Sequence, residues 1–144
     1  MARKRVYACD LATRCNPAWR YWQDVGTIDS YFDANTSLLD MPPALDLHDA
    51  TWPVRTYAGQ HPPAVLRAAG GVETRVTDSF VSPGCVLEGA TLRRGMLSPG
   101  VSVGAGARVE ESILLPGVRI EPGAVVRRAV VDVNVVAEGA VVCE

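Results

Sequence analysis

Aliphatic side chains recur every five or six positions through the second half of the chain. They are Val81, Val86, Leu92, Leu97, Val103, Val109, Leu114, Ile120, Val126, Val131, Val136 and Val142. This spacing matches neither the period of about 3.6 residues of an α-helix nor the two-residue alternation of a long strand. It predicts short strands joined by frequent turns, each with one aliphatic side chain that points inward.

A longer repeat is superimposed on this spacing. Residues 81–97, 98–114 and 115–131 form three blocks of 17 residues, and 132–144 begins a fourth. Each block has a Gly-Ala pair at the same place, and Pro-Gly pairs supply the turns that a corner requires. The pattern is typical of hexapeptide repeats and predicts a left-handed parallel β-helix of about three and a half coils. A helical bundle is excluded because an interior glycine or proline costs a helix about 1–3 kcal/mol.

The first half of the chain has a different pattern. Residues 22–39 predict a loop followed by a helix, with Thr27 as N-cap and Asp29 in the first turn. Pro42 and Pro43 are expected to end the helix. Residues 45–65 are polar and rich in proline, and predict an extended segment. The helix has an apolar stripe of Ile28, Tyr31, Phe32, Leu38 and Leu39.

Composition narrows the possible functions. The net charge is −2, and the only basic cluster is at residues 3–5, so we expect no nucleic-acid binding. No apolar run approaches the roughly 18 residues of a membrane span, so we expect no membrane insertion. The four cysteines are scattered, which favours a reduced, cytoplasmic setting over a disulfide framework or a zinc site.

Several motifs occur together before the repeats. The sequence reads Tyr-Trp-x-Asp-Val-Gly-Thr-x-x-x-Tyr-x-x-Ala-Asn from Tyr21 to Asn35, followed by Trp-Pro-Val-Arg-Thr-Tyr at 52–57 and Pro-Pro-Ala at 62–64. In this order, leading into a hexapeptide β-helix, they resemble the glucose-1-phosphate adenylyltransferases, also called ADP-glucose pyrophosphorylases. The resemblance runs from about Val6 to the C-terminus and covers the C-terminal region of that family.

The resemblance implies a Mg²⁺-dependent enzyme of glycogen or starch synthesis that joins ATP and glucose 1-phosphate into ADP-glucose and pyrophosphate. It implies that Trp22 lies beside the glucosyl group and that Asp24 is a Mg²⁺ ligand, as a carboxylate shared with substrate phosphates would be. The residues by themselves allow a plainer interpretation. Asp24 can order the turn into the helix, and Trp22 can be a core residue.

The family's glycine-rich phosphate loop and its other catalytic residues have no counterpart in the sequence. We therefore expect the chain alone to be inactive, to contain no catalytic residue and to need no cofactor, whereas a complete enzyme would use Mg²⁺. The expected domains are 1–57, a remnant of the nucleotidyltransferase catalytic domain, 58–75, a linker, and 76–144, the β-helix. The expected partner is a second copy, or a full-length or N-terminal pyrophosphorylase.

Two further functions remain open. The resemblance implies arginines near the β-helix junction as regulatory sites, and Arg127 and Arg128 are the best candidates. Arginines and glutamates alternate along the same corner, at 93–94, 110–111 and 127–128, so ion pairs between coils are an alternative.

A non-catalytic assembly or regulatory module that binds a full-length pyrophosphorylase is the main rival function. A β-helix acyltransferase or zinc hydratase is disfavoured because His48 and His61, the only histidines, both precede the coils.

Overall fold

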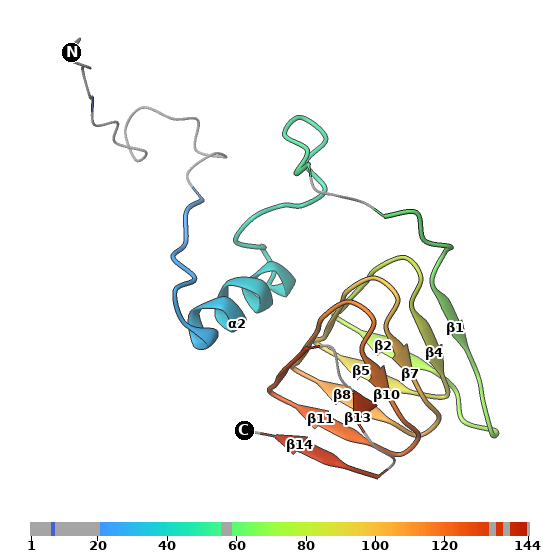
Figure 1. Cartoon of the computed structure of the whole chain (residues 1–144). Coiled ribbons are helices and arrows are strands. Elements are labelled where there is room, and N and C mark those ends of the chain that lie inside the picture. Colours follow the sequence, from blue (N-terminus) through green and yellow to red (C-terminus); the bar gives the residue numbers. More distant parts are fainter. Residues whose placement is uncertain (1–6, 8–20, 56–58, 133–134, 137–138, 144) are drawn as a thin grey trace, which may run out of the picture.

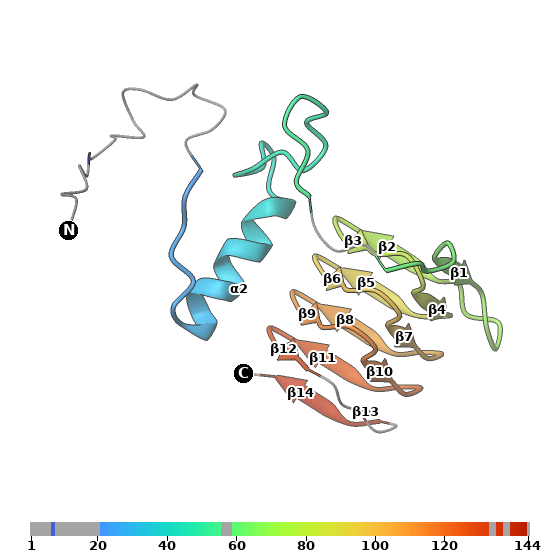
Figure 2. The same ribbon diagram turned by 45° about the horizontal axis from the view of Figure 1, so that its top comes forward.

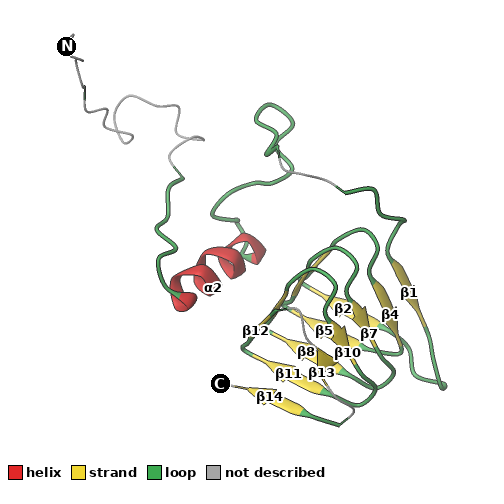
Figure 3. Cartoon of the chain, in the orientation of Figure 1, coloured by secondary structure: helices red, strands yellow, loops and turns green. Residues whose placement is uncertain are grey.

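The computed structural model describes residue 7 and residues 21–55, 59–132, 135–136 and 139–143. One helix, α2 (Ile28–Thr36), is followed by a 3₁₀ turn, η2 (Ser37–Leu39), and all later elements in the described part are short strands. The strands wind around a common axis, and α2 lies beside the resulting prism (Figure 1). Figure 3 shows the same division into a helical segment and a region of strands.

The strands form three parallel sheets, one on each side of the prism. Sheet 1 contains β1 (Val65–Arg67), β4 (Val86–Glu88), β7 (Ser102–Val103), β10 (Arg119–Ile120) and β13 (Val135–Val136). Sheet 2 contains β2 (Arg75–Thr77), β5 (Thr91–Arg93), β8 (Arg108–Glu110), β11 (Val125–Arg127) and β14 (Val141–Cys143). Sheet 3 contains β3 (Phe80–Val81), β6 (Met96–Leu97), β9 (Ile113–Leu114) and β12 (Val130–Val131).

Each strand from β1 to β11 pairs with the strand three elements later in the chain, which lies one coil further along the axis. The turned view shows these coils stacked in chain order (Figure 2). The mainly β fold and the parallel β-helix predicted from the hexapeptide repeats are therefore confirmed. Its core is a stack of apolar side chains that includes Leu92, Val109 and Val126, all inside sheet 2.

One predicted inward position is wrong by a residue. Val86 is only half-buried, whereas its neighbour Leu87 is 0% exposed. Leu87 pairs with Val103 in the ladder between β4 and β7, so Leu87 is the residue stacked in the core. The corner after Leu87 is one residue shorter than the corner after Val103. The prediction assumed the same corner length in every 17-residue block, and it therefore placed the inward position of this strand one residue too early.

The core also contains residues that the six-residue spacing did not select. Cys85, Val101 and Val118 are 0% exposed and stack beside sheet 1. Burial raises the pKa of the Cys85 thiol above its usual value, because the low-polarity interior disfavours the thiolate. Ala90, Ala107 and Ala124 fill the corner before sheet 2.

The β-helix begins within the segment expected to be a linker. Residues 58–75 include the whole of β1, which pairs with β4 from Val65 to Arg67. They also include the first residue of β2, and the turn between these strands contains Gly70 and Gly71, both at positive φ. The first coil is therefore built from residues on both sides of the predicted boundary at 76.

The predicted helix is present with its predicted cap. The Thr27 hydroxyl accepts a hydrogen bond from the Ser30 N–H at 3.1 Å, and the Ser30 hydroxyl accepts one from the Thr27 N–H at 3.0 Å. This reciprocal pair satisfies two amides that the helix itself leaves unpaired. The helix ends at Thr36, before Pro42 and Pro43, with η2 between them. Within the described residues, no helix has the length and apolar character needed to cross a membrane.

Candidate functional site

Trp22 and Asp24 lie in the extended segment immediately before α2. The Trp22 side chain is 73% exposed, so it is not a core residue of the described structure. Asp24 is also exposed, and its Oδ1 accepts a hydrogen bond from the Gly26 N–H at 3.1 Å. This local turn directs the chain into the Thr27 cap. One role suggested for Asp24 by the sequence, ordering the turn into the helix, is therefore observed.

The metal-binding role of Asp24 requires oxygen ligands from elsewhere. The described residues contain no group of three or more His, Cys, Asp or Glu side chains placed to hold a metal ion. Mg²⁺ is commonly held by one or two carboxylates together with substrate phosphates and water. Asp24 fits as a single ligand of such an ion, with its Oδ1 already engaged by Gly26. The role stays a prediction.

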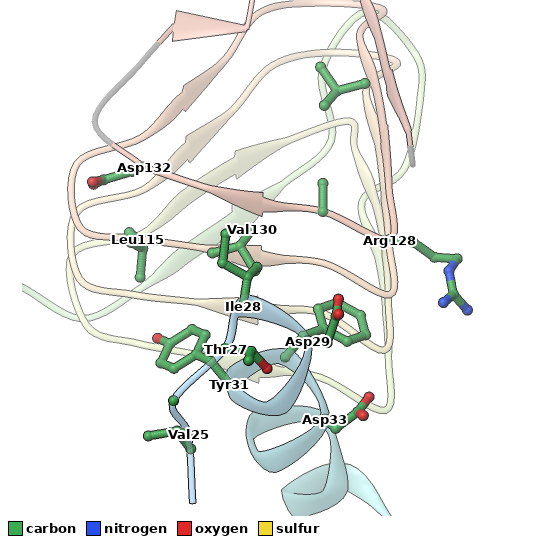
Figure 4. Close-up of a pocket in the computed structure, with 14 residues that line it drawn as sticks. Val25, Thr27, Ile28, Asp29, Tyr31, Asp33, Leu115, Arg128, Val130 and Asp132 are labelled. Carbon is green, nitrogen blue, oxygen red and sulfur yellow. The ribbon is translucent and has the colours of Figure 1, made fainter.

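A cleft of about 950 Å³ separates the N-terminal half of α2 from the β-helix (Figure 4). On the helix side, Ile28 points toward Val130 of β12. Val142 of β14 and Leu115, which follows β9, belong to the opposite wall. The cleft lies directly after the segment that carries Trp22 and Asp24, but neither residue lines it.

The charges around this cleft are mainly negative. Asp29, Asp33 and Asp132 line it together with one guanidinium, that of Arg128. Among the described residues, Arg128 forms no ion pair, and Figure 4 shows its side chain directed away from Val130. A rim with three carboxylates and one cation does not favour an anionic ligand. The cleft therefore lends little electrostatic support to a regulatory anion site at Arg128.

Arg127 is engaged elsewhere. Its Nε lies 3.1 Å from Glu110 Oε2, and the same carboxylate lies 3.6 Å from Arg93 Nη2 in the preceding coil. Arg93 also lies 3.5 Å from Glu111 Oε1. The alternation of arginine and glutamate along this corner thus forms the ion pairs between coils that the sequence allowed. The structure separates Arg127, paired on the outside of sheet 2, from Arg128, at the cleft.

Sequence reasoning missed a contact between the helical segment and the β-helix. Arg94 Nη2 donates a hydrogen bond to Asp40 Oδ1 at 3.0 Å, just after η2. Nothing in the sequence pairs these residues, because they are 54 positions apart and belong to regions with different patterns. Later in the same segment, hydrogen bonds from the Thr51 hydroxyl and from backbone N–H groups lower the pKa of Asp49, an exposed turn residue.

Comparison with known proteins identifies the family of the β-helix. Residues 62–144 match the family described as GlmU-like, C-terminal hexapeptide. The chain belongs to this family. The chain is also similar to curated proteins named glucose-1-phosphate adenylyltransferase, two of which are compared with it. The protein from Koribacter versatilis (strain Ellin345) is 42% identical over 141 residues, which are 96% of this chain and 34% of the relative. The protein from Mesorhizobium japonicum is 38% identical over 146 residues, which are 100% of this chain and 34% of the relative.

The predicted resemblance is therefore confirmed, and it applies to the C-terminal region of these relatives. The chain spans about a third of the length of the curated relatives it matches. Similarity also extends beyond the hexapeptide region, because the family match starts at residue 62 whereas the relatives align with nearly the whole chain. The segment with Trp22 and Asp24 is thus part of the similarity.

Proposed function

We propose that the chain forms the C-terminal part of a glucose-1-phosphate adenylyltransferase, an enzyme that makes ADP-glucose and pyrophosphate from ATP and glucose 1-phosphate. One observation carries the proposal: relatives of that name align with 96–100% of the chain, including the helical segment as well as the β-helix. In this proposal the nucleotide-binding portion lies in the other two thirds of the enzyme, which the chain does not match. The reaction belongs to glycogen synthesis in the cytoplasm, which the scattered cysteines favour.

The described geometry supports a role for the Trp22 segment at the edge of such a site. Trp22 is exposed on the same short segment as Asp24, and both precede a capped helix that fixes the end of the segment. In the complete enzyme, Trp22 would contact the glucosyl group and Asp24 would provide one oxygen ligand to Mg²⁺. The metal would supply charge neutralisation for nucleotidyl transfer, and these two residues would position the substrate.

A chimera tests this function. The C-terminal third of the Koribacter protein is replaced by residues 1–144 of this chain, and ADP-glucose formation is measured with ATP, glucose 1-phosphate and Mg²⁺. We expect activity from the chimera and none from the 144-residue chain alone. The control is the Koribacter protein truncated before the same junction.

Two results of this experiment would contradict different parts of the proposal. A soluble, folded chimera without activity would contradict the proposed function. Activity from the 144-residue chain alone would contradict the assignment of the nucleotide-binding portion to the remainder of the enzyme.

An assembly or regulatory module is a second candidate, because the family match is confined to the β-helix at residues 62–144. Such a module binds a second copy of itself or a full-length pyrophosphorylase. Co-purification with the full-length Koribacter protein, without incorporation into an active chimera, would favour the module. Light scattering across micromolar concentrations measures self-association, and a strictly monomeric chain would exclude the homo-oligomer.

A further inference from the structure

Sheet 3 differs from the other two sheets on its outer face. Its inward residues, including Leu97 and Leu114, belong to the core, so the residues before them point outward. These outward residues form a column of Phe80, Met96, Ile113 and Val130, in register from strand to strand. We call this column the apolar ladder. On sheet 2, by contrast, Arg108 and Glu110 flank the buried Val109.

The apolar ladder is covered from outside the β-helix at Ile113 and is half-buried at its other residues. Ile113 is only 3% exposed although it is absent from the core cluster, so another part of the chain shields it. Helix α2 is the element that lies along this side (Figure 2). Its residues Tyr31 and Phe32 are half-buried and share the cleft with Val130 at the end of the ladder. The ladder therefore faces α2: Ile113 is buried on this face, whereas the cleft lies between α2 and Val130.

The other end of the helical segment is fixed by Arg94. This residue follows β5 at the corner between sheets 2 and 3, and its backbone has a φ of +47°. The Arg94 N–H donates to the Thr77 carbonyl at 3.1 Å, which joins this corner to the previous coil. From this fixed backbone the side chain reaches Asp40, 3.0 Å away. Among the described residues, it is the one ion pair between the helical segment and the coils.

These contacts have a consequence for Trp22 and Asp24. The short turn at Gly26 and the Thr27 cap connect both residues to α2, so the placement of α2 on the β-helix sets where they lie. We propose that Arg94, through its ion pair with Asp40, is a positioning residue for the segment that carries Trp22 and Asp24, and that the apolar ladder is the surface along which α2 is held. The β-helix thereby has a part in catalysis besides assembly. The catalytic half of this statement rests on the proposed function.

The structural half is tested on the 144-residue chain by hydrogen exchange of the amides in residues 28–39. Arg94→Asp places two carboxylates together, and we expect exchange in α2 to become about two- to fivefold faster. The swap Asp40→Arg with Arg94→Asp restores the pair and should return exchange to the original rate. Arg119→Asp, a charge reversal on sheet 1, is the matched control and should leave α2 unchanged.

The catalytic half is tested in the active chimera. Arg94→Asp should lower kcat/KM about fivefold or more, because a small displacement of positioning groups is costly, and the swap should recover it. Unchanged exchange in Arg94→Asp, or a swap that restores neither readout, would overturn the positioning role. A third outcome is possible: exchange in the 144-residue chain responds as expected, but the chimera is inactive. The Arg94–Asp40 contact would then stand, and the proposed function would be refuted.

Discussion

At the scale of single residues, the structure shows local hydrogen-bonding roles for Asp24, which the sequence singled out as a metal ligand, and for Ser112, which the sequence did not single out. Asp24 accepts a hydrogen bond that shapes the turn before α2, whatever else its carboxylate binds. Ser112, fully buried in the corner after β8, bridges two backbone groups: its hydroxyl donates to the Glu110 carbonyl and accepts from the Ala129 N–H one coil away. Each of these residues supports a measurable prediction.

The two roles of Asp24 can be separated by substitution. Asp24→Asn keeps an oxygen that accepts from Gly26 but removes the negative charge. If Asp24 is a Mg²⁺ ligand, both Asp24→Asn and Asp24→Ala should lower kcat/KM of the chimera about a hundredfold or more. If Asp24 only orders the turn, Asp24→Asn should have near-normal activity and only Asp24→Ala should lose activity. Asp33→Asn, an exposed carboxyl on α2, is the control.

Loss of the Ser112 hydroxyl should destabilise the β-helix. Ser112→Ala removes the acceptor of the Ala129 N–H at 3.2 Å in a site closed to water. An unpaired buried amide costs about 1–3 kcal/mol of unfolding free energy, measured by urea denaturation. Ser102→Ala should change it by less than about 0.5 kcal/mol, because Ser102 in β7 is only half-buried. Equal effects of the two substitutions would contradict this account.

At the scale of elements, alternating charges on successive strands of sheet 2 form ion pairs between neighbouring coils. Glu110 lies between Arg93 in the coil before and Arg127 in the coil after, and pairs with both. The next residues along this corner, Arg94 and Glu111, have left-handed backbone conformations, with φ of +47° and +46°. Regular stacking of these corners brings residues 17 positions apart within ion-pair distance.

Reversal of the central charge should weaken this stack. Glu110→Arg places three guanidiniums in one column, whereas Glu110→Gln only removes the attraction. The pairs are partly exposed, so Glu110→Gln should cost about 0–1 kcal/mol and Glu110→Arg more. Thermal unfolding at low and high salt gives the check, because screening should reduce the difference between the variants. A difference that does not respond to salt would point to packing instead of charge.

At the scale of the whole molecule, the coils share one continuous core. Leu114, in sheet 3, is 0% exposed and lies between Leu97 and Val131 of the neighbouring coils. In a stack of this kind each coil is stabilised by its neighbours, so a defect in the middle affects both sides. The helical segment depends on the same stack because α2 lies along its apolar ladder (Figure 2).

A cavity in the middle of the stack should therefore be costly. Leu114→Ala should reduce the free energy of unfolding by about 2–5 kcal/mol, measured in urea. Val141→Ala, in the terminal strand β14, is the control and should cost well under 1 kcal/mol, since that side chain is 66% exposed. Similar losses for both variants would show that the terminal coil is as tightly packed as the middle.

Much of the fold was determined by the sequence alone. A six-residue spacing of aliphatic side chains, with glycine and proline at the corners, is compatible with few structures other than a β-helix. The Thr27 cap was equally local, because a cap depends on residues within one turn of each other. The motif from Tyr21 to Asn35 is also a contiguous stretch of chain, so its residue order was sufficient to indicate the relatives.

Tertiary structure decided what depends on contacts between distant residues. The ladder between β4 and β7, not the repeat, selects Leu87 over Val86 for the core, because backbone pairing fixes register. The different environments of Arg127 and Arg128, the cleft beside α2, and the Arg94–Asp40 contact all depend on where the helical segment lies on the coils. No periodicity within either region encodes that placement, since it arises from packing between the two.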